Sequence, residues 1–136
     1  MKKILNVILL TFLIISCQGQ QKSKLDNEKL DQIESNKRTL DALKDAGEKF
    51  KASRDIFHWL YFENKTDLNN FLSEIKSNGY ELVNSNIIKD KLPYQLQIKI
   101  NDFVSKTTMD SQVIYLVDMA KKYNGDYDGW ETSVEK

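Results

Sequence analysis

The chain has 136 residues, of which 40% are hydrophobic and 29% charged, and its 20 basic side chains balance 20 acidic ones. This length suits one modest domain, and 10% aromatic residues with a single proline exclude collagen-like, proline-rich and fully disordered chains. One cysteine excludes a disulfide framework and a cysteine-rich zinc site, and the even charge balance argues against a dedicated nucleic-acid binder. We expect neither a metal ion nor a cofactor.

The amino terminus has the parts of an export signal in the required order. Lys2 and Lys3 precede a twelve-residue apolar stretch over 4–15, shorter than the ~20 residues that span a bilayer. The stretch leads into the sequence IISC, ending at Cys17, which resembles the lipobox of bacterial lipoproteins. In a lipobox the sulfur of the cysteine takes up diacylglycerol. After cleavage, this cysteine is the first residue of the mature protein. The alternatives are an ordinary signal peptide with a chance cysteine, or a buried apolar helix.

Cleavage before Cys17 would remove residues 1–16 with two lysines and leave a formal charge of −2 on 120 residues. We therefore expect a domain outside the cytoplasm, held on the bacterial cell envelope by lipid on Cys17. Gln18 is not the aspartate of the inner-membrane retention signal, which favours the outer membrane. Residues 17–27 are polar without periodicity and predict a flexible tether. Over 28–49, apolar residues spaced by three, seven and three predict a charged amphipathic helix.

The remaining segment, 50–136, begins with a strand, a helix and a second strand. Residues 56–62 are aromatic or aliphatic except for one histidine and predict a central strand. Thr66 is a candidate N-cap for a helix that ends at Asn78-Gly79. A second strand is expected over 80–88.

The last part of the chain predicts a strand, a helix and a strand. After Pro93, apolar and polar residues alternate cleanly, as in a strand with one buried and one wet face. A second helix is expected over 109–123, with Asn124-Gly125 as its stop, and a final strand over 126–135.

This order predicts an α+β domain of the ferredoxin-like βαββαβ type, preceded by an extra helix. In that architecture two helices cover one face of a four-stranded antiparallel sheet. The opposite sheet face is then open, and an open sheet face is a natural binding surface.

Three stretches of this segment stand out as motifs: HWLYF at 58–62, SNGYEL at 77–82 and YNGDYDGWET at 123–132. The most specific part is the run Tyr127, Asp128, Gly129 and Trp130, which follows a helix ending in a glycine-containing turn. With the lead-in over 40–47 and Arg54, these motifs resemble the family of regulator of ribonuclease activity B, the ribonuclease E inhibitor, over about residues 38–136.

The resemblance implies the same ferredoxin-like fold and inhibition of the ribonuclease by direct protein binding, with no chemistry of its own. A lipoprotein outside the cytoplasm cannot meet a cytoplasmic ribonuclease. Our main expectation is therefore a membrane-anchored, non-enzymatic protein-binding module with an unknown partner. The alternative is a cytoplasmic-type regulator that inhibits ribonuclease E by binding it.

His58 is the only histidine and lies between two aromatic residues on the first strand. We expect it to be a structural residue bonded to a neighbouring carboxylate, because no serine or cysteine nucleophile pattern accompanies it. Asp126 and Asp128 lie two apart and are expected in a solvated turn, with Gly129 supplying a bulge. A less favoured hypothesis is an envelope hydrolase that uses His58 and Asp128.

The aromatic residues suggest contacts with a partner. Trp59 and Tyr61 on an open sheet face would suit base stacking, but the third strand carries polar residues and the mature charge is negative, so RNA binding is the least favoured option. We expect Trp130 to pack on the core, whereas Tyr127 is either a core residue or a partner anchor. The candidate partner-binding or family-motif residues are thus His58, Trp59, Tyr61, Tyr127, Asp128, Gly129 and Trp130.

Overall fold

The computed structural model describes the backbone of residues 2–135 and the side chains of residues 19–135. The export signal expected over 1–16 and Cys17, on which we expect lipid, therefore lie outside the residues whose side chains are described. In the described part of the chain, no helix combines the length and the apolar character needed to cross a bilayer.

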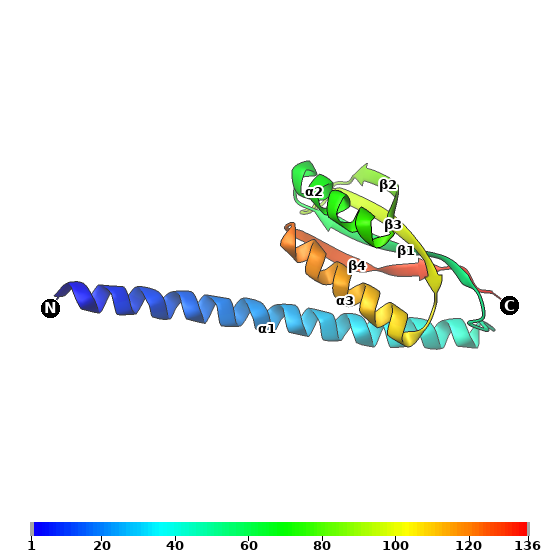
Figure 1. Ribbon diagram of the computed structural model, residues 1–136, viewed down its shortest axis with the longest axis horizontal. Helices are drawn as coiled ribbons and strands as arrows, with labels where there is room; N and C mark the ends of the chain where they lie inside the picture. The colour runs from blue at the N-terminus through cyan, green and yellow to red at the C-terminus, as the bar shows by residue number, and fades with distance from the viewer. Residues whose placement is uncertain (1, 136) are drawn as a thin grey trace.

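The helices are α1 (Lys2–Asp45), α2 (Lys65–Ile75) and α3 (Lys106–Lys122), and a short 3-10 turn, η1 (Lys76–Asn78), follows α2. The strands are β1 (Ser53–Phe62), β2 (Glu81–Ile87), β3 (Tyr94–Phe103) and β4 (Gly125–Thr132). They form one antiparallel sheet in the order β2-β3-β1-β4 (Figure 1). This βαββαβ arrangement behind a leading helix confirms the predicted fold class.

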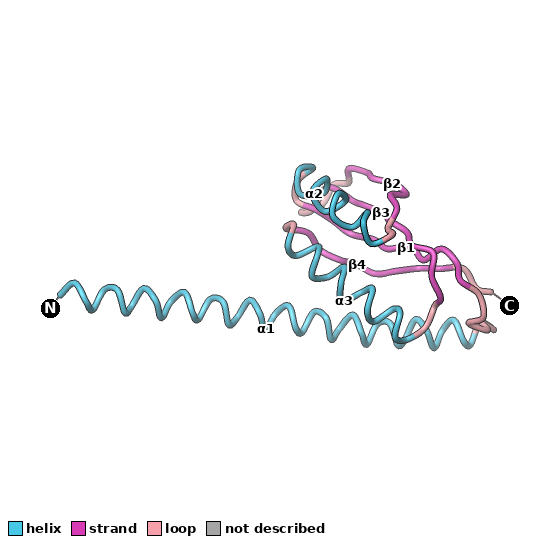
Figure 2. Tube along the Cα trace, in the orientation of Figure 1, coloured by secondary structure: helices cyan, strands magenta, loops and turns pink. Residues whose placement is uncertain are grey.

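The sheet has one buried face because side chains alternate along its central strands. On β1 every second residue is fully buried, namely Ile56, His58, Leu60 and Phe62. On β3, Leu96 and Ile98 are fully buried, as the alternation after Pro93 predicts. Both α2 and α3 lie on this face (Figure 2) and share one hydrophobic core with it.

Side chains just outside the helices fix where α2 and α3 begin. The side-chain oxygen of Asn64, Oδ1, accepts the backbone N–H of Asp67 at 2.9 Å, so Asn64 is the N-cap of α2. The prediction of Thr66 as N-cap was wrong, because Thr66 already lies in the first turn. The Ser105 hydroxyl caps α3 in the same way, and this helix therefore starts earlier than predicted, at Lys106.

The leading helix is longer than the sequence predicts. Residues 17–27, expected to form a flexible tether, continue α1, and the helix ends at Asp45. Gly47 follows with a φ of 94°, the left-handed conformation expected of a helix stop.

Tertiary contacts hold α1 against the rest of the domain from Leu25 onward. Leu25 packs against the main core, and Lys29 Nζ lies 2.6 Å from Asp118 Oδ1. Closer to the end of α3, Glu28 Oε2 lies 3.2 Å from Lys121 Nζ. Because these contacts are tertiary, the local sequence pattern alone does not reveal them.

Trp130 joins α1 to the sheet. Its indole N–H donates to Asn36 Oδ1 at 2.8 Å, and the Asn36 amide N–H donates in turn to Asp110 Oδ1 at 3.0 Å. Asn36 is buried, and the Trp130 ring packs against both hydrophobic clusters of the domain. Trp130 is therefore half-buried inside the fold, and through Asn36 it holds α1, α3 and β4 together.

Glu48 ties the connection between α1 and β1 to the C-terminal segment. Its carboxylate accepts the guanidinium of Arg54 at 2.8 Å and the backbone N–H groups of Phe50 at 2.6 Å and Glu135 at 2.7 Å. Burial alone would raise the pKa of Glu48, but these three hydrogen bonds outweigh burial and lower that pKa to about 2. The family-like Arg54 is thus half of a buried ion pair.

Gly125 is required by close packing and not by its backbone angle. The left-handed residue after α3 is Asn124, with a φ of 52°, and Gly125 starts β4 opposite Phe62. A Cβ at Gly125 would lie 2.6 Å from the Phe62 ring and 2.8 Å from the Tyr61 carbonyl oxygen. We predict that Gly125→Ala lowers the free energy of unfolding by about 1–3 kcal/mol in urea melts.

The matched control is Gly129→Ala in the same strand. A Cβ at Gly129 meets nothing within 4 Å, and its φ is not in the left-handed region. Equal stability losses in the two variants would contradict the packing described at Gly125.

Candidate functional site

His58 lies at the centre of the helix-covered face, and both of its ring nitrogens are occupied. Nδ1 lies 2.9 Å from the Tyr127 hydroxyl, and Nε2 lies 3.2 Å from Gln112 Oε1. The Tyr80 ring meets the imidazole edge-on at a centroid distance of 5.9 Å. The histidine thus connects β1 to β4 and α3 in the core.

The hydrogen-bond partners define the tautomer of His58. Gln112 Nε2 donates to Asp102 Oδ2 at 3.0 Å, which turns the Gln112 carbonyl oxygen toward the imidazole. A carbonyl oxygen only accepts, so His58 Nε2 carries the proton, and Nδ1 accepts the proton of the Tyr127 hydroxyl. Neutral imidazole satisfies every group in this chain of hydrogen bonds.

Burial keeps this imidazole neutral. It lowers the pKa of His58 to about 4, against a smaller opposing effect of the Gln112 hydrogen bond. Burial also raises the pKa of the Tyr127 hydroxyl well above its ordinary value. Both groups are therefore neutral near pH 7, and neither faces solvent.

The structure corrects two hypotheses about His58. The partner expected from the sequence was a carboxylate, but the partners are a phenol and an amide, with Asp102 one step further away. The hydrolase hypothesis is wrong, because His58 is fully buried with both nitrogens bonded, whereas Asp128 is exposed. A buried base without access to solvent does not reach a substrate.

The bulge expected near Gly129 is present. The register between β1 and β4 shifts so that Trp59 faces Gly129 and Leu60 faces Tyr127, and Asp128 has no partner opposite it. Tyr127 is consequently buried beside His58 while Asp126 and Asp128 are exposed. Asp126 is not free, since its carboxylate pairs with Lys121.

The opposite face of the sheet carries a row of aromatic side chains. Phe57, Trp59 and Tyr61 alternate with the buried residues of β1 and are half-buried. Both helices that cover the sheet lie on the other side (Figure 1). This row, the aromatic row, therefore faces outward.

Polar side chains on the neighbouring strands surround the aromatic row and are bonded to it. The Trp59 indole N–H and the Gln97 amide both donate to Glu131 Oε1 at 3.3 Å, and Gln95 donates to the Tyr61 hydroxyl at 3.2 Å. At the end of the row, Asp55 accepts from Lys99 at 2.8 Å. These contacts hold the aromatic rings in place. The face around the rings carries positive and negative side chains.

The hydrogen bond from Lys99 lowers the pKa of Asp55, and the same bond raises the pKa of Lys99. Both side chains are therefore ionised near pH 7. The open face thus combines fixed charges with aromatic surface, a combination that suits recognition of a protein surface.

The sequence-predicted site residues do not form one cluster. Trp59, Tyr61 and Asp128 are on the open side, whereas His58 and Tyr127 are buried on the other side. Sequence reasoning missed Phe57 and Glu131 of the open face and Gln112 of the core. Strand alternation signals Phe57, which shares a face with Trp59, but no local pattern signals Gln112.

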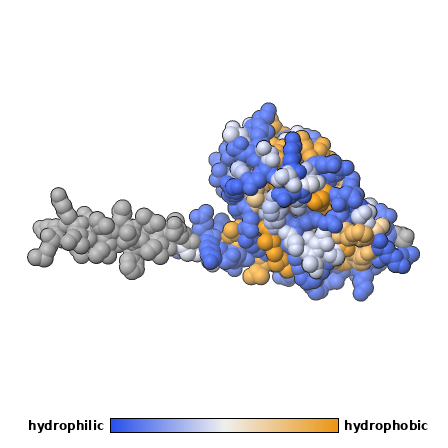
Figure 3. All heavy atoms as spheres, viewed as in Figure 1, coloured by the Kyte–Doolittle hydropathy of each residue, from blue (hydrophilic) through white to orange (hydrophobic). Residues whose placement is uncertain are grey.

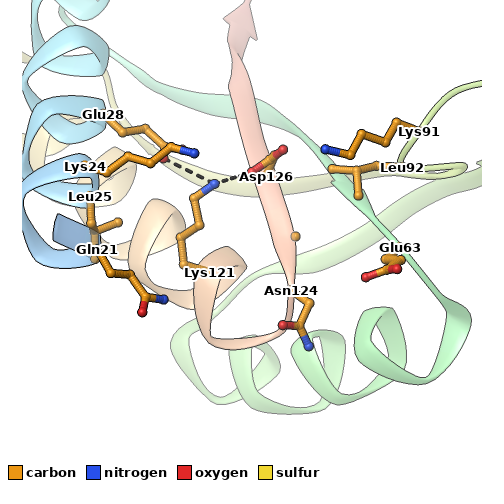
Figure 4. Close-up of a pocket in the computed structure, with 11 residues that line it drawn as sticks. Gln21, Lys24, Leu25, Glu28, Glu63, Lys91, Leu92, Lys121, Asn124 and Asp126 are labelled. Carbon is orange, nitrogen blue, oxygen red and sulfur yellow. Dashed lines mark hydrogen bonds and ion pairs between the residues drawn. The ribbon is translucent and has the colours of Figure 1, made fainter. Parts of the chain in front are cut away.

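A cavity of about 430 Å³ lies between α1, the α3–β4 turn and the loop before β3 (Figure 4). Its charged lining is balanced, because Lys121 bridges Glu28 and Asp126 across it. Among residues 19–135 there is no group of three or more His, Cys, Asp and Glu side chains able to hold a metal ion.

Together, the fold and the two sheet faces define a small α+β domain with a hydrophobic core that contains the His58 hydrogen-bond network, and with an open aromatic face. The chain matches the family model of regulator of ribonuclease activity B over residues 33–132, and it belongs to that family. Members of this family are non-enzymatic regulators, and this chain is accordingly not an enzyme. None of the curated proteins compared with the chain matches it.

Because His58 is neutral in the fold and titrates near pH 6.5 when unfolded, it links stability to pH. The contribution of neutral His58 to the free energy of unfolding is complete above about pH 6.5. It is lost as the pH falls below this value, because the unfolded chain takes up a proton on His58 and the folded chain does not. The loss reaches roughly 3 kcal/mol near pH 4. We predict that the free energy of unfolding of the wild type falls between pH 6.5 and pH 5.

His58→Gln removes this titration and keeps a hydrogen-bonding side chain. The variant should be less stable at pH 7, but its stability should change little between pH 6.5 and pH 5. Glu48 does not interfere, because its folded and unfolded pKa values are about 2 and 4.5. A variant with the same pH slope as the wild type would contradict a buried neutral histidine.

Proposed function

We propose that this chain regulates a ribonuclease of the ribonuclease E type by binding it as a protein partner. Membership of the family of regulator of ribonuclease activity B is the observation that carries this proposal. The proposed contact surface is the aromatic row of Phe57, Trp59 and Tyr61 with the polar side chains that surround it.

The form of the open face supports that surface. Aromatic side chains supply most of the binding energy at protein interfaces when a polar rim surrounds them. Here the rings are already held by Glu131 and Gln95, so binding would order few further side chains. The rim also carries both signs of charge, which gives orientation to a protein partner.

The test is binding of the purified chain to ribonuclease E from the same organism, followed by RNA cleavage with and without the chain. We predict that Trp59→Ala with Tyr61→Ala weakens binding by at least tenfold, about 1.4 kcal/mol, and relieves inhibition equally. The fold should survive, because both side chains are outside the buried core.

Leu30→Ala is the matched control, since Leu30 is a large apolar residue exposed on α1. It should bind the ribonuclease like the wild type. If the wild-type chain neither binds nor inhibits the enzyme, the ribonuclease is not its target. If the chain binds and the double variant binds equally well, the proposed surface is wrong.

The sequence before residue 18 supports a second candidate, in which the same binding domain is held at the cell envelope by lipid on Cys17. This candidate rests on the order of three features, namely Lys2-Lys3, the apolar stretch and Ser16-Cys17. Two or three acyl chains would hold the protein firmly, since each buried methylene contributes ~0.8 kcal/mol. The regulated partner would then be an envelope protein and not a cytoplasmic ribonuclease.

Mass measurement of the chain purified from its own host separates the two candidates. Lipidation predicts a chain that starts at Cys17 and carries diacylglycerol, and Cys17→Ser should abolish both the modification and membrane association. An intact amino terminus with an unmodified thiol would remove the lipid-anchored candidate and leave the ribonuclease as the partner to pursue.

A further inference from the structure

The sequence SNGYEL at 77–82 forms part of the wall of a hollow on the helix side of the sheet. Gly79 ends the η1 turn with a φ of 85° and leads the chain toward β2. The hollow has a volume of about 230 Å³, and its polar lining includes Asn78, Tyr80, Asp102, Gln112 and Tyr115. On this side of the molecule, hydrophilic side chains dominate the surface over α2 and α3 (Figure 3).

The hydroxyl of Tyr80 has no hydrogen-bond partner in the described part of the chain. Its side chain is buried, with 5% exposed. Among residues 19–135, the only side-chain atoms that are both sealed from solvent and unpartnered belong to Arg54, so the Tyr80 hydroxyl reaches the open space of the hollow. A nearly buried polar group without a protein partner points to one that comes from outside.

The Tyr80 hydroxyl keeps its proton near neutral pH. Burial raises the pKa of Tyr80, and the nearby Tyr115 and Asp102 raise it further. The hydroxyl is therefore uncharged, and its oxygen is free to accept a hydrogen bond.

Asp102 brings a carboxylate without a cationic partner to the hollow. It is half-buried and accepts only neutral N–H groups, from the Gln112 side chain at 3.0 Å and from the Phe103 backbone at 2.7 Å. No lysine, arginine or histidine lines the hollow. A carboxylate in these surroundings attracts a cationic hydrogen-bond donor and repels an anion.

An aromatic wall beside the carboxylate favours a planar cation. The Tyr80 and Tyr115 rings are stacked, with a centroid distance of 6.1 Å and an interplanar angle of 16°. The Asn78 amide donates to the Tyr115 hydroxyl at 2.7 Å and holds this ring in place. A guanidinium group stacks on aromatic rings and is less strongly hydrated than an ammonium group, so it suits this wall better.

We propose that the hollow binds a guanidinium group, which donates to the Asp102 carboxylate and the Tyr80 hydroxyl oxygen and lies against the Tyr115 ring. This site goes beyond the proposed function and does not depend on the ribonuclease, since it lies on the side of the sheet opposite the aromatic row. The guanidinium belongs either to a free small molecule or to an arginine of a protein.

NMR titration of the full chain with methylguanidinium chloride tests the proposal. At up to about 50 mM, well below denaturing concentrations, we expect saturable shifts of the Tyr80 and Tyr115 ring signals and of the Gln112 side-chain amide. The expected Kd is about 1–10 mM. Urea has a similar planar shape and N–H donors without the charge, so it should bind about tenfold more weakly. Equal binding of urea would contradict a cation site.

Two variants test the assigned contacts. Tyr80→Phe removes only the hydroxyl, so it should melt like the wild type and bind methylguanidinium about fivefold more weakly. A clear loss of stability would contradict a hydroxyl without a partner inside the fold. Asp102→Asn keeps an oxygen that accepts from Gln112 but removes the charge, and should weaken binding about tenfold.

Tyr94→Phe is the matched control, because Tyr94 lies at the other end of β3 and outside the hollow. It should bind methylguanidinium like the wild type. Three results would overturn the proposal: no saturable shift at Tyr80 in the wild type, shifts confined to the open face, or a site variant that binds as the wild type does.

Two further probes identify the source of the guanidinium. A blocked glycine-arginine-glycine peptide that binds more tightly than free L-arginine would assign the site to an arginine of a protein. Tighter binding of L-arginine would assign it to a free small molecule, and both results support the site. Because no ribonuclease is present in these titrations, their failure leaves the proposed function unaffected.

Discussion

The fold of this protein depends on a neutral histidine at the centre of its buried sheet face. His58 donates from Nε2 to Gln112 and accepts from Tyr127 at Nδ1, and this arrangement exists only while the imidazole is uncharged. The buried network joins β1 to α3 and β4, and Asp102 at the end of β3 fixes its direction. Charging the ring would leave a cation without a partner in the core, which is why burial holds its pKa low.

The most specific part of the family-like sequence, residues 127–130, serves this architecture. Tyr127 bonds to His58, the bulge at Asp128 turns the strand, and Trp130 bonds to Asn36 of α1. These positions therefore stabilise the domain and attach its leading helix. The surface that we propose for partners is the opposite sheet face, where the aromatic row of Phe57, Trp59 and Tyr61 points outward.

Strand and helix periodicity predicts the order of elements in this chain because each element has one apolar face. The same alternation places His58 inside and Trp59 outside. It does not predict that Gln112, on a helix 54 residues further along the chain, bonds to His58, because that contact depends on how α3 lies on the sheet. Local periodicity likewise does not predict that α1 packs against the domain from Leu25 onward, since the contacts of Leu25 and Lys29 are tertiary.

The neutral state of His58 is tested most directly by the ¹⁵N chemical shifts of its imidazole, followed by NMR between pH 7 and pH 5. We predict a neutral ring with the proton on Nε2 and no titration in this range. An imidazole that becomes protonated near pH 6.5, or one that carries its proton on Nδ1, would contradict the buried hydrogen-bond network on which the fold and its open face depend.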